Sequence, residues 1–236
     1  MGSGLPQNSQ DLSADRGLSD FNAKHRLSFS FLYDLPTGHV WADGPGWGRK
    51  LLQNWQAGGI LTAQSGSPFT VVLPGAPAAS AAAFGNPQRP DLVGDPTKAG
   101  PVTANPACQA PAQVGTPQNW FNQCAFAEPA TETFGPAFGT EGRNILIGPG
   151  FTNLDFALTK SIALHGENHR LQLRGEFFNL LNHPNFDIPA HTFNLASCAQ
   201  DPAQLCPAGN YGSILSANSY GDRPPRQIQL SVKYAF

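Results

Sequence analysis

The chain has 236 residues, with 14 Lys and Arg residues against 16 Asp and Glu residues, so its formal net charge is −2. Nucleic-acid-binding proteins carry clustered basic residues, and this near-neutral sequence has no such run, which argues against nucleic acid as a partner. Charged residues make up only 13% of the chain, while 25 glycines and 22 prolines leave little room for long helices.

The N-terminal region carries no targeting or membrane-spanning signal. No run of 18 or more apolar residues is present anywhere, so the sequence predicts no transmembrane helix. The first residues lack the basic, apolar and small-residue order of a signal peptide. Residues 1–24 are interpreted as a linker or as the end of a preceding loop.

The first strand is expected at Arg26–Leu35. Every second residue of this segment is apolar, and Leu32 is the only apolar residue on the opposite face. Alternation with a period of two is the pattern of a half-buried strand. A second candidate, Trp55–Val72, is weaker because glycines dilute its pattern and because Gly66 and Pro68 interrupt it.

Residues 73–150 contain 12 prolines and 10 glycines. Connections in soluble β-sandwiches rarely reach this length. A stretch of this composition is not expected to build a core of its own. We therefore interpret residues 73–150 as a long irregular loop.

Two further strands are expected at Leu154–Ile162 and Leu171–Leu181. Apolar and polar residues alternate in both, and the turn sequence Leu164–Asn168 separates them, which is typical of a β-hairpin. A second long loop, 182–225, follows. The short Tyr211–Ala217 run inside it is interpreted as part of that loop and not as a membrane strand.

The last strand, Arg226–Phe236, has the clearest alternation in the chain. One face carries only apolar side chains, those of Ile228, Leu230, Val232, Tyr234 and Phe236. With 40% apolar residues in the chain, five apolar residues at five such positions would arise by chance about once in a hundred cases. The opposite face is mostly polar.

Strands of about ten residues, short turns at one end and long loops at the other are typical of outer-membrane β-barrels. The predicted fold class is therefore all-β, a partial antiparallel transmembrane β-barrel. If the last strand ends on the periplasmic side, the Pro36–Asn54 and Leu164–Asn168 connections are periplasmic, and the loops 73–150 and 182–225 are external. The terminal Phe236 suits an aromatic girdle at the membrane interface.

Short motifs are distributed along the chain from about Asp20. The two most specific are Glu176–Phe186, with the sequence EFFNLLNHPNF, and Pro225–Gln229, which leads to the terminal Phe236. Weaker ones are Asp20–Phe21 with His25–Arg26, Asn54–Gln56 with Gly59–Ile60, Gln64–Val71, Trp120–Asn122 with Ala125–Phe126, Gly142–Asn144, and Gly148–Phe151 with Leu154–Asp155. Together they resemble the C-terminal barrel region of TonB-dependent outer-membrane receptors, specifically the Oar-like group abundant in Acidobacteria.

The resemblance implies a barrel of roughly 22 strands with a plugged lumen, of which this chain would supply about the last five. It also implies the partners: outer-membrane lipid, the rest of the barrel and its plug, the TonB system acting through that plug, and the barrel-assembly machinery. The plug and the export signal expected of the family are missing from this chain, so we expect it to be a C-terminal fragment. In the family the assembly machinery reads a C-terminal strand that ends in Phe, a pattern matched here by Ile228, Leu230, Val232, Tyr234 and Phe236.

Polar residues of the last two strands are candidate lumen-facing groups, because the polar side of a barrel strand faces the lumen. They are Gln172, Arg174, Glu176, Gln227, Gln229 and Lys233. Arg174 and Glu176 either touch the plug or a passing ligand, or simply form a water-facing ion pair. In the first loop, Trp120, Phe121 and Phe126 are candidate ligand contacts, with the alternative that they anchor the loop by packing together.

The four cysteines form two close pairs in the sequence, Cys108 with Cys124 and Cys198 with Cys206. Neither pair has metal-ligand spacing, so two local disulfides are favoured, with free thiols in loops as the alternative. His165 and His169 flank a glutamate at the wrong offset for a zinc-binding helix, and the Gly and Asn between them favour a turn. No motif indicates an enzyme, a metal site or a cofactor.

The predicted function is that of the C-terminal barrel portion of a TonB-dependent transporter in the bacterial outer membrane, which contributes wall strands and external loops to energy-coupled uptake. The alternative is a secreted or surface-exposed β-protein that binds ligands or adheres. A soluble domain of that kind needs a second layer over its apolar strands, and the sequence offers no such set. Siderophore, carbohydrate and peptide substrates all remain compatible with these loops. Five strands leave two open edges, so the isolated chain is not expected to form a channel.

Overall fold

The computed structural model describes residues 6–8, 11–36, 46–73, 88–129, 138–164, 169–193, 210–217 and 225–236. The chain divides into two compact units. Unit 1 comprises Met1–Lys24, Gly66–Gly150 and Phe186–Ser219, and unit 2 comprises His25–Ser65, Phe151–Asn185 and Tyr220–Phe236. Most of the two long segments expected to be external loops, 73–150 and 182–225, therefore lies in one unit together with residues 1–24, and most of the expected strand residues lie in the other.

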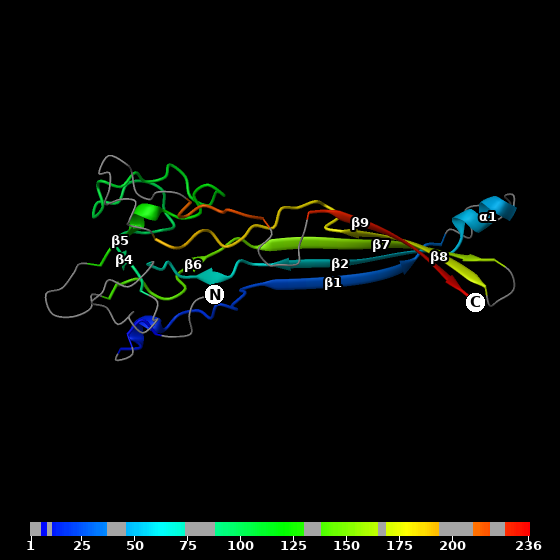
Figure 1. The fold of residues 1–236 in the computed structure, drawn as a ribbon, viewed down its shortest axis with the longest axis horizontal. Coiled ribbons are helices and arrows are strands. Elements are labelled where there is room, and N and C mark those ends of the chain that lie inside the picture. Colours follow the sequence, from blue (N-terminus) through cyan, green and yellow to red (C-terminus); the bar gives the residue numbers. More distant parts are fainter. Residues whose placement is uncertain are drawn as a thin grey trace. The chain divides into compact units, whose positions relative to one another are not determined.

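Unit 2 is a five-stranded antiparallel sheet in the order β1-β2-β7-β8-β9 (Figure 1). The strands are β1 (Arg26–Asp34), β2 (Trp55–Gln64), β7 (Phe151–Ala163), β8 (Arg170–Phe178) and β9 (Gln227–Ala235). Each strand pairs with the next one of this sheet along the chain, so the sheet is an up-and-down meander. The predicted all-β antiparallel class and the predicted hairpin, β7 with β8, are confirmed; the turn residues 165–168 lie outside the described residues.

The second strand is shorter than its sequence pattern predicts. β2 ends at Gln64, and Pro68–Phe69 form a separate strand, β3, which pairs with β6 (Leu146–Ile147) in unit 1. A Cβ at Gly66 would clash with the carbonyl oxygen of Gly148, so only glycine allows this close approach. The prediction of one strand over Trp55–Val72 is wrong in its second half, and the predicted interruption is confirmed.

The register gives the sheet two chemically different faces. Directly paired residues of antiparallel strands lie on the same face. Leu173 pairs with Val232, and Glu176 pairs with Gln229, so apolar residues meet apolar residues and polar residues meet polar ones. At Gly59 the ring of Phe31 covers the missing side chain, since a Cβ there would lie 2.6 Å from its Cε1 atom. The glycines that weaken the sequence pattern thus make room for a neighbouring aromatic ring.

Unit 1 has little regular structure among its described residues. Besides the β3–β6 pair, β4 (Asp91–Leu92) pairs with β5 (Phe126–Ala127), and 3₁₀ turns span Ser13–Asp15 and Gln123–Ala125. Tyr211–Ala217 contributes no strand, as predicted. Hydrogen bonds from side chains to the backbone take the place of strand pairing here. The buried Asn122 donates through Nδ2 to the carbonyl oxygens of Lys98 at 2.8 Å and Gly100 at 2.9 Å.

Unit 1 nevertheless has a hydrophobic core. Its buried residues are Phe69, Val71, Phe121, Ala125, Phe126, Leu146, Phe193 and Tyr211. The ring of Phe121 packs edge-to-face on Phe126 at 5.7 Å and on Tyr211 at 5.3 Å between centroids. Residues 73–150 do not build this core alone, in keeping with the prediction, because Phe69, Val71, Phe193 and Tyr211 from outside that stretch complete it.

One helix is described, α1 (Gly46–Leu52), in the connection between β1 and β2. Across the described ranges, no helix has the length and apolar character needed to span a membrane. Among the described residues the sheet does not close into a barrel, because β1 and β9 form its two open edges. The predicted total of roughly 22 strands remains a prediction.

Candidate functional site

The polar face of the sheet is hollow. Residues of β1, β2, β7 and β8 line a depression of about 530 Å³, and most of them belong to this face. Among the lining residues are Gln56, Asp155, Thr159, Gln172, Arg174 and Glu176. A concave polar face is the arrangement expected of the inner wall of a barrel that holds water or ligand.

The six candidate lumen-facing residues share this face. Gln172 pairs with Lys233, and Glu176 pairs with Gln229. Gln227 pairs with Phe178, which lies two residues after Glu176 in β8 and therefore on the same face. Arg174 and Glu176 form an ion pair at 2.8 Å, with 48% and 24% of their side chains exposed. Both side chains are partly exposed, and an exposed pair of this kind contributes little to stability. Its charges remain available to whatever occupies the hollow.

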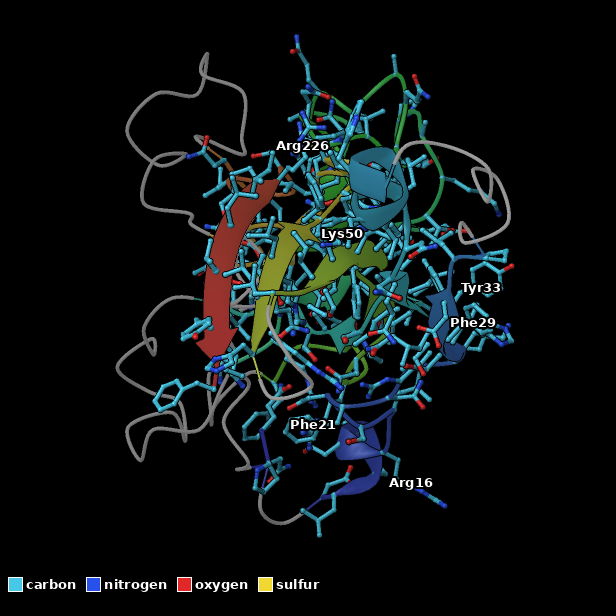
Figure 2. All side chains as sticks on the ribbon, turned by 90° about the vertical axis from the view of Figure 1, so that its right-hand side faces the viewer. Arg16, Phe21, Phe29, Tyr33, Lys50 and Arg226 are labelled. Atoms are coloured by element: carbon cyan, nitrogen blue, oxygen red, sulfur yellow. A yellow bond between two sulfur atoms is a disulfide. The ribbon has the colours of Figure 1, made fainter. Side chains whose placement is uncertain are left out.

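The apolar face is exposed, most of all on β9. Leu230 is 79% exposed and Val232 is 69% exposed, and Ile228, Tyr234 and Phe236 are exposed beside them. β1 shows the same feature, and Figure 2 shows its labelled Phe29 and Tyr33 pointing away from the neighbouring strands. Exposed apolar surface of this extent marks an interaction surface.

Aromatic side chains lie at one end of the sheet, the end at which β1 and β9 finish and β2 begins. Tyr33 is the penultimate residue of β1, Trp55 is the first of β2, and Tyr234 lies near the end of β9, which runs parallel to β1. Tyr234 stacks on Phe236 at 5.8 Å between ring centroids, and its hydroxyl lies 2.7 Å from Nδ1 of His169. Aromatic residues at strand ends form the girdles of membrane barrels. The girdle at Phe236 and the recognition of this strand in barrel assembly remain predictions.

The candidate ligand contacts of the first loop are core residues instead. Phe121 is 1% exposed and Phe126 is fully buried, so neither ring can touch a ligand, and that interpretation is wrong for both. Trp120 packs against the same core, and its Nε1 donates to the carbonyl oxygen of Ile147 at 2.8 Å. The alternative, that these residues anchor the loop, describes them correctly. Sequence alone could not separate the two because it does not show what covers the rings.

One predicted disulfide is present. Cys108 and Cys124 are bonded, with their Cα atoms 5.6 Å apart. Cys198 and Cys206 lie outside the described residues, so their predicted bond stays a prediction. Among the described residues, no group of three or more His, Cys, Asp or Glu side chains could hold a metal ion.

A buried ionisable group in unit 1 has no signal in the sequence. Glu141 is fully buried, and its Oε1 accepts a hydrogen bond from the Val71 N–H at 3.0 Å. Burial raises the pKa of its carboxyl to about 8, although the Val71 hydrogen bond and the charge of Arg89 lower it. Burial and the Glu141 charge raise the pKa of Tyr211. Arg89 is itself buried and pairs with Asp15 at 2.7 Å.

The chain matches one family of known proteins. No curated protein and no solved structure shows significant similarity to it. Residues 1–229 match the family described as outer membrane beta barrel domain. Alternating strands with one apolar and one polar face, as found in unit 2, are typical of outer-membrane barrels. The match spans nearly the whole chain and indicates an outer-membrane location. The chain therefore belongs to the outer membrane beta barrel domain family.

Proposed function

We propose that the chain supplies wall strands and a folded external loop unit to a TonB-dependent transporter of the Oar-like group. The observation that carries the proposal is the five-stranded meander with one apolar face, one polar face and two open edges. Unpaired strand edges are not tolerated in lipid, so these strands require further strands on both sides. This supports a larger barrel, for which the resemblance suggests roughly 22 strands.

In this proposal the apolar face contacts outer-membrane lipid and the hollow polar face lines the lumen. Gln172, Arg174 and Glu176 then meet the plug or a passing substrate. Arg174 and Glu176 offer both signs of charge within one hydrogen-bonding distance, 2.8 Å, which suits a polar partner. The TonB system acts through the plug, and the barrel-assembly machinery binds the edge strand β9. We assign no enzymatic activity and no cofactor to the chain.

The exposed apolar face argues against a secreted adhesive protein. A soluble sheet covers its apolar face with a second layer. Leu230 and Val232 are more than two-thirds exposed, at 79% and 69%, and such side chains on successive positions of one face would promote aggregation in water. Lipid is the partner that these residues fit.

The test is energy-dependent uptake by the full-length protein. A host without its own receptors is supplied with labelled ferric siderophores, oligosaccharides and peptides, with and without TonB. We expect saturable uptake of one class that is lost without TonB or after an uncoupler collapses the proton gradient. Host porins that pass a small sugar provide the control. Uptake that is indifferent to both treatments would contradict TonB dependence and would favour a passive pore.

A further inference from the structure

One cation lies on the apolar face of the sheet. Lys160 of β7 pairs with Trp55 of β2 and Leu173 of β8, so its side chain shares their face. It is 3% exposed. An unpaired ammonium group on a lipid-facing surface is costly, so its partners matter.

The partners of Lys160 are the last carbonyl groups of α1 and its continuation. Its Nζ donates to the carbonyl oxygen of Lys50 at 2.7 Å and also to that of Gln53. Trp55 adds a second contact, because its Nε1 donates to the carbonyl oxygen of Leu51 at 2.9 Å, and its ring centroid lies 5.6 Å from the Lys160 ammonium. A cation at the C-terminal end of a helix satisfies its free carbonyls and complements its dipole.

These contacts fix α1 on the apolar side of the sheet, at the strand ends that carry Tyr33, Trp55 and Tyr234. On this helix Trp47 is 69% exposed and Leu51 is 59% exposed. The two residues are four apart, so they project from the same side of the helix. Lys50 is exposed next to them. Tryptophan, leucine and lysine in this arrangement are typical of helices that lie in a membrane interface.

We propose that α1 is an interfacial helix that inserts Trp47 and Leu51 into the headgroup and acyl boundary of the phospholipid leaflet. The partner is the lipid surface, and Lys50 lies at the level of its phosphates. The exposed apolar pair continues the apolar face that the barrel presents to lipid, and Lys160 prevents the helix from leaving that face. The inference goes beyond the proposed transport function and rests on the lipid contact of the apolar face and on the predicted periplasmic side of the Pro36–Asn54 connection.

The test uses the full-length protein in nanodiscs of phosphatidylethanolamine and phosphatidylglycerol. The photo-crosslinking residue p-benzoylphenylalanine replaces Trp47 or Leu51, and adducts are identified by mass spectrometry after irradiation. Leu230 on β9 is the matched position on the strand face, and Leu215, which is 61% exposed in unit 1, is the matched position outside it. We expect lipid adducts at Trp47, Leu51 and Leu230 and none at Leu215.

Two failures are distinguishable. Lipid adducts at Leu230 with none, or only protein adducts, at Trp47 and Leu51 would overturn the interfacial helix while leaving the barrel. No lipid adducts at any of these positions would overturn the lipid contact of the whole apolar face. A variant with Lys160→Met provides a further check, because lipid adducts at Trp47 should fall once only the Trp55 hydrogen bond holds the helix to the sheet. Unchanged adducts would contradict the role assigned to Lys160.

Discussion

At the scale of single residues, the two faces of β9 predict opposite responses to one substitution. Leu230→Arg or Val232→Arg places a charge on the lipid face and should cost about 2–4 kcal/mol of folding free energy near the membrane midplane. Gln229→Arg places the same charge opposite Glu176 on the polar face and should be tolerated. Equilibrium folding of the full-length protein into vesicles measures both, and equal losses on the two faces would refute the assignment.

The buried carboxyl of Glu141 predicts a pH dependence of unit 1. Its pKa is about 8 in the folded protein against an ordinary value of 4.5. Between these two values the folded state holds a proton that the unfolded state releases, so stability is greatest below pH 4.5 and falls as the pH rises through 8. Unit 1 should therefore be less stable at pH 9 than at pH 5, by on the order of a few kcal/mol.

Hydrogen exchange of the amides around Val71, corrected for the intrinsic effect of pH, measures this loss in the full-length protein. Arg89 and Tyr211 are the titratable groups that interact with the carboxyl. Glu141→Gln keeps the acceptor for the Val71 N–H and should flatten the profile. A variant that retains the same slope as the native protein would assign the pH dependence to another group.

Period-two alternation in the sequence predicts which face of a strand a residue occupies, but it does not predict which loop residues are buried. The side of the strand that each of Gln172, Glu176 and Gln229 occupies follows from period-two alternation alone, and the register confirms that they share a face. The burial of Phe121 and of Glu141 depends on contacts with residues about 70 to 90 positions away, such as Val71 and Tyr211. Local patterns carry no information about such contacts.

At the scale of elements, the Cys108–Cys124 disulfide predicts a measurable contribution to unit 1. The bond closes a loop with a sequence separation of 16. A loop of this length contributes about 3 kcal/mol by restricting the unfolded chain. Reduction, or Cys108→Ser with Cys124→Ser, should speed hydrogen exchange throughout 88–129 in the full-length protein. Unchanged exchange there would mean that hydrogen bonds such as those of Asn122 hold the loop without it.

Strands were predictable and the loop core was not, for a physical reason. A strand reveals itself by local alternation because each face meets a single environment. Unit 1 combines short pairs such as β3 with β6, whose residues lie more than 70 positions apart. The end of β2 shows this limit of prediction. Gly66 and Pro68 indicate the interruption of the strand from the local sequence, whereas nothing in the local sequence indicates that Phe69 pairs with Leu146.

In the molecule as a whole, the two units are stabilised by different interactions. Unit 2 is held by strand pairing and leaves an apolar face for lipid, whereas unit 1 buries aromatic residues as a water-soluble domain does. Family membership fixes the outer-membrane barrel. Transport, the plug and the TonB system remain proposals that uptake experiments decide.

Lipid contact of the apolar face can be measured position by position along β9. Spin labels are placed one at a time at each position from Gln227 to Ala235 of the full-length protein in nanodiscs, with Cys198 and Cys206 replaced by serine. Oxygen concentrates in the acyl layer, so accessibility to oxygen reports lipid contact. If the apolar face contacts lipid, accessibility alternates with a period of two, high at Leu230 and Val232 and low at their neighbours. Uniform accessibility, or maxima on the polar face, would contradict this contact.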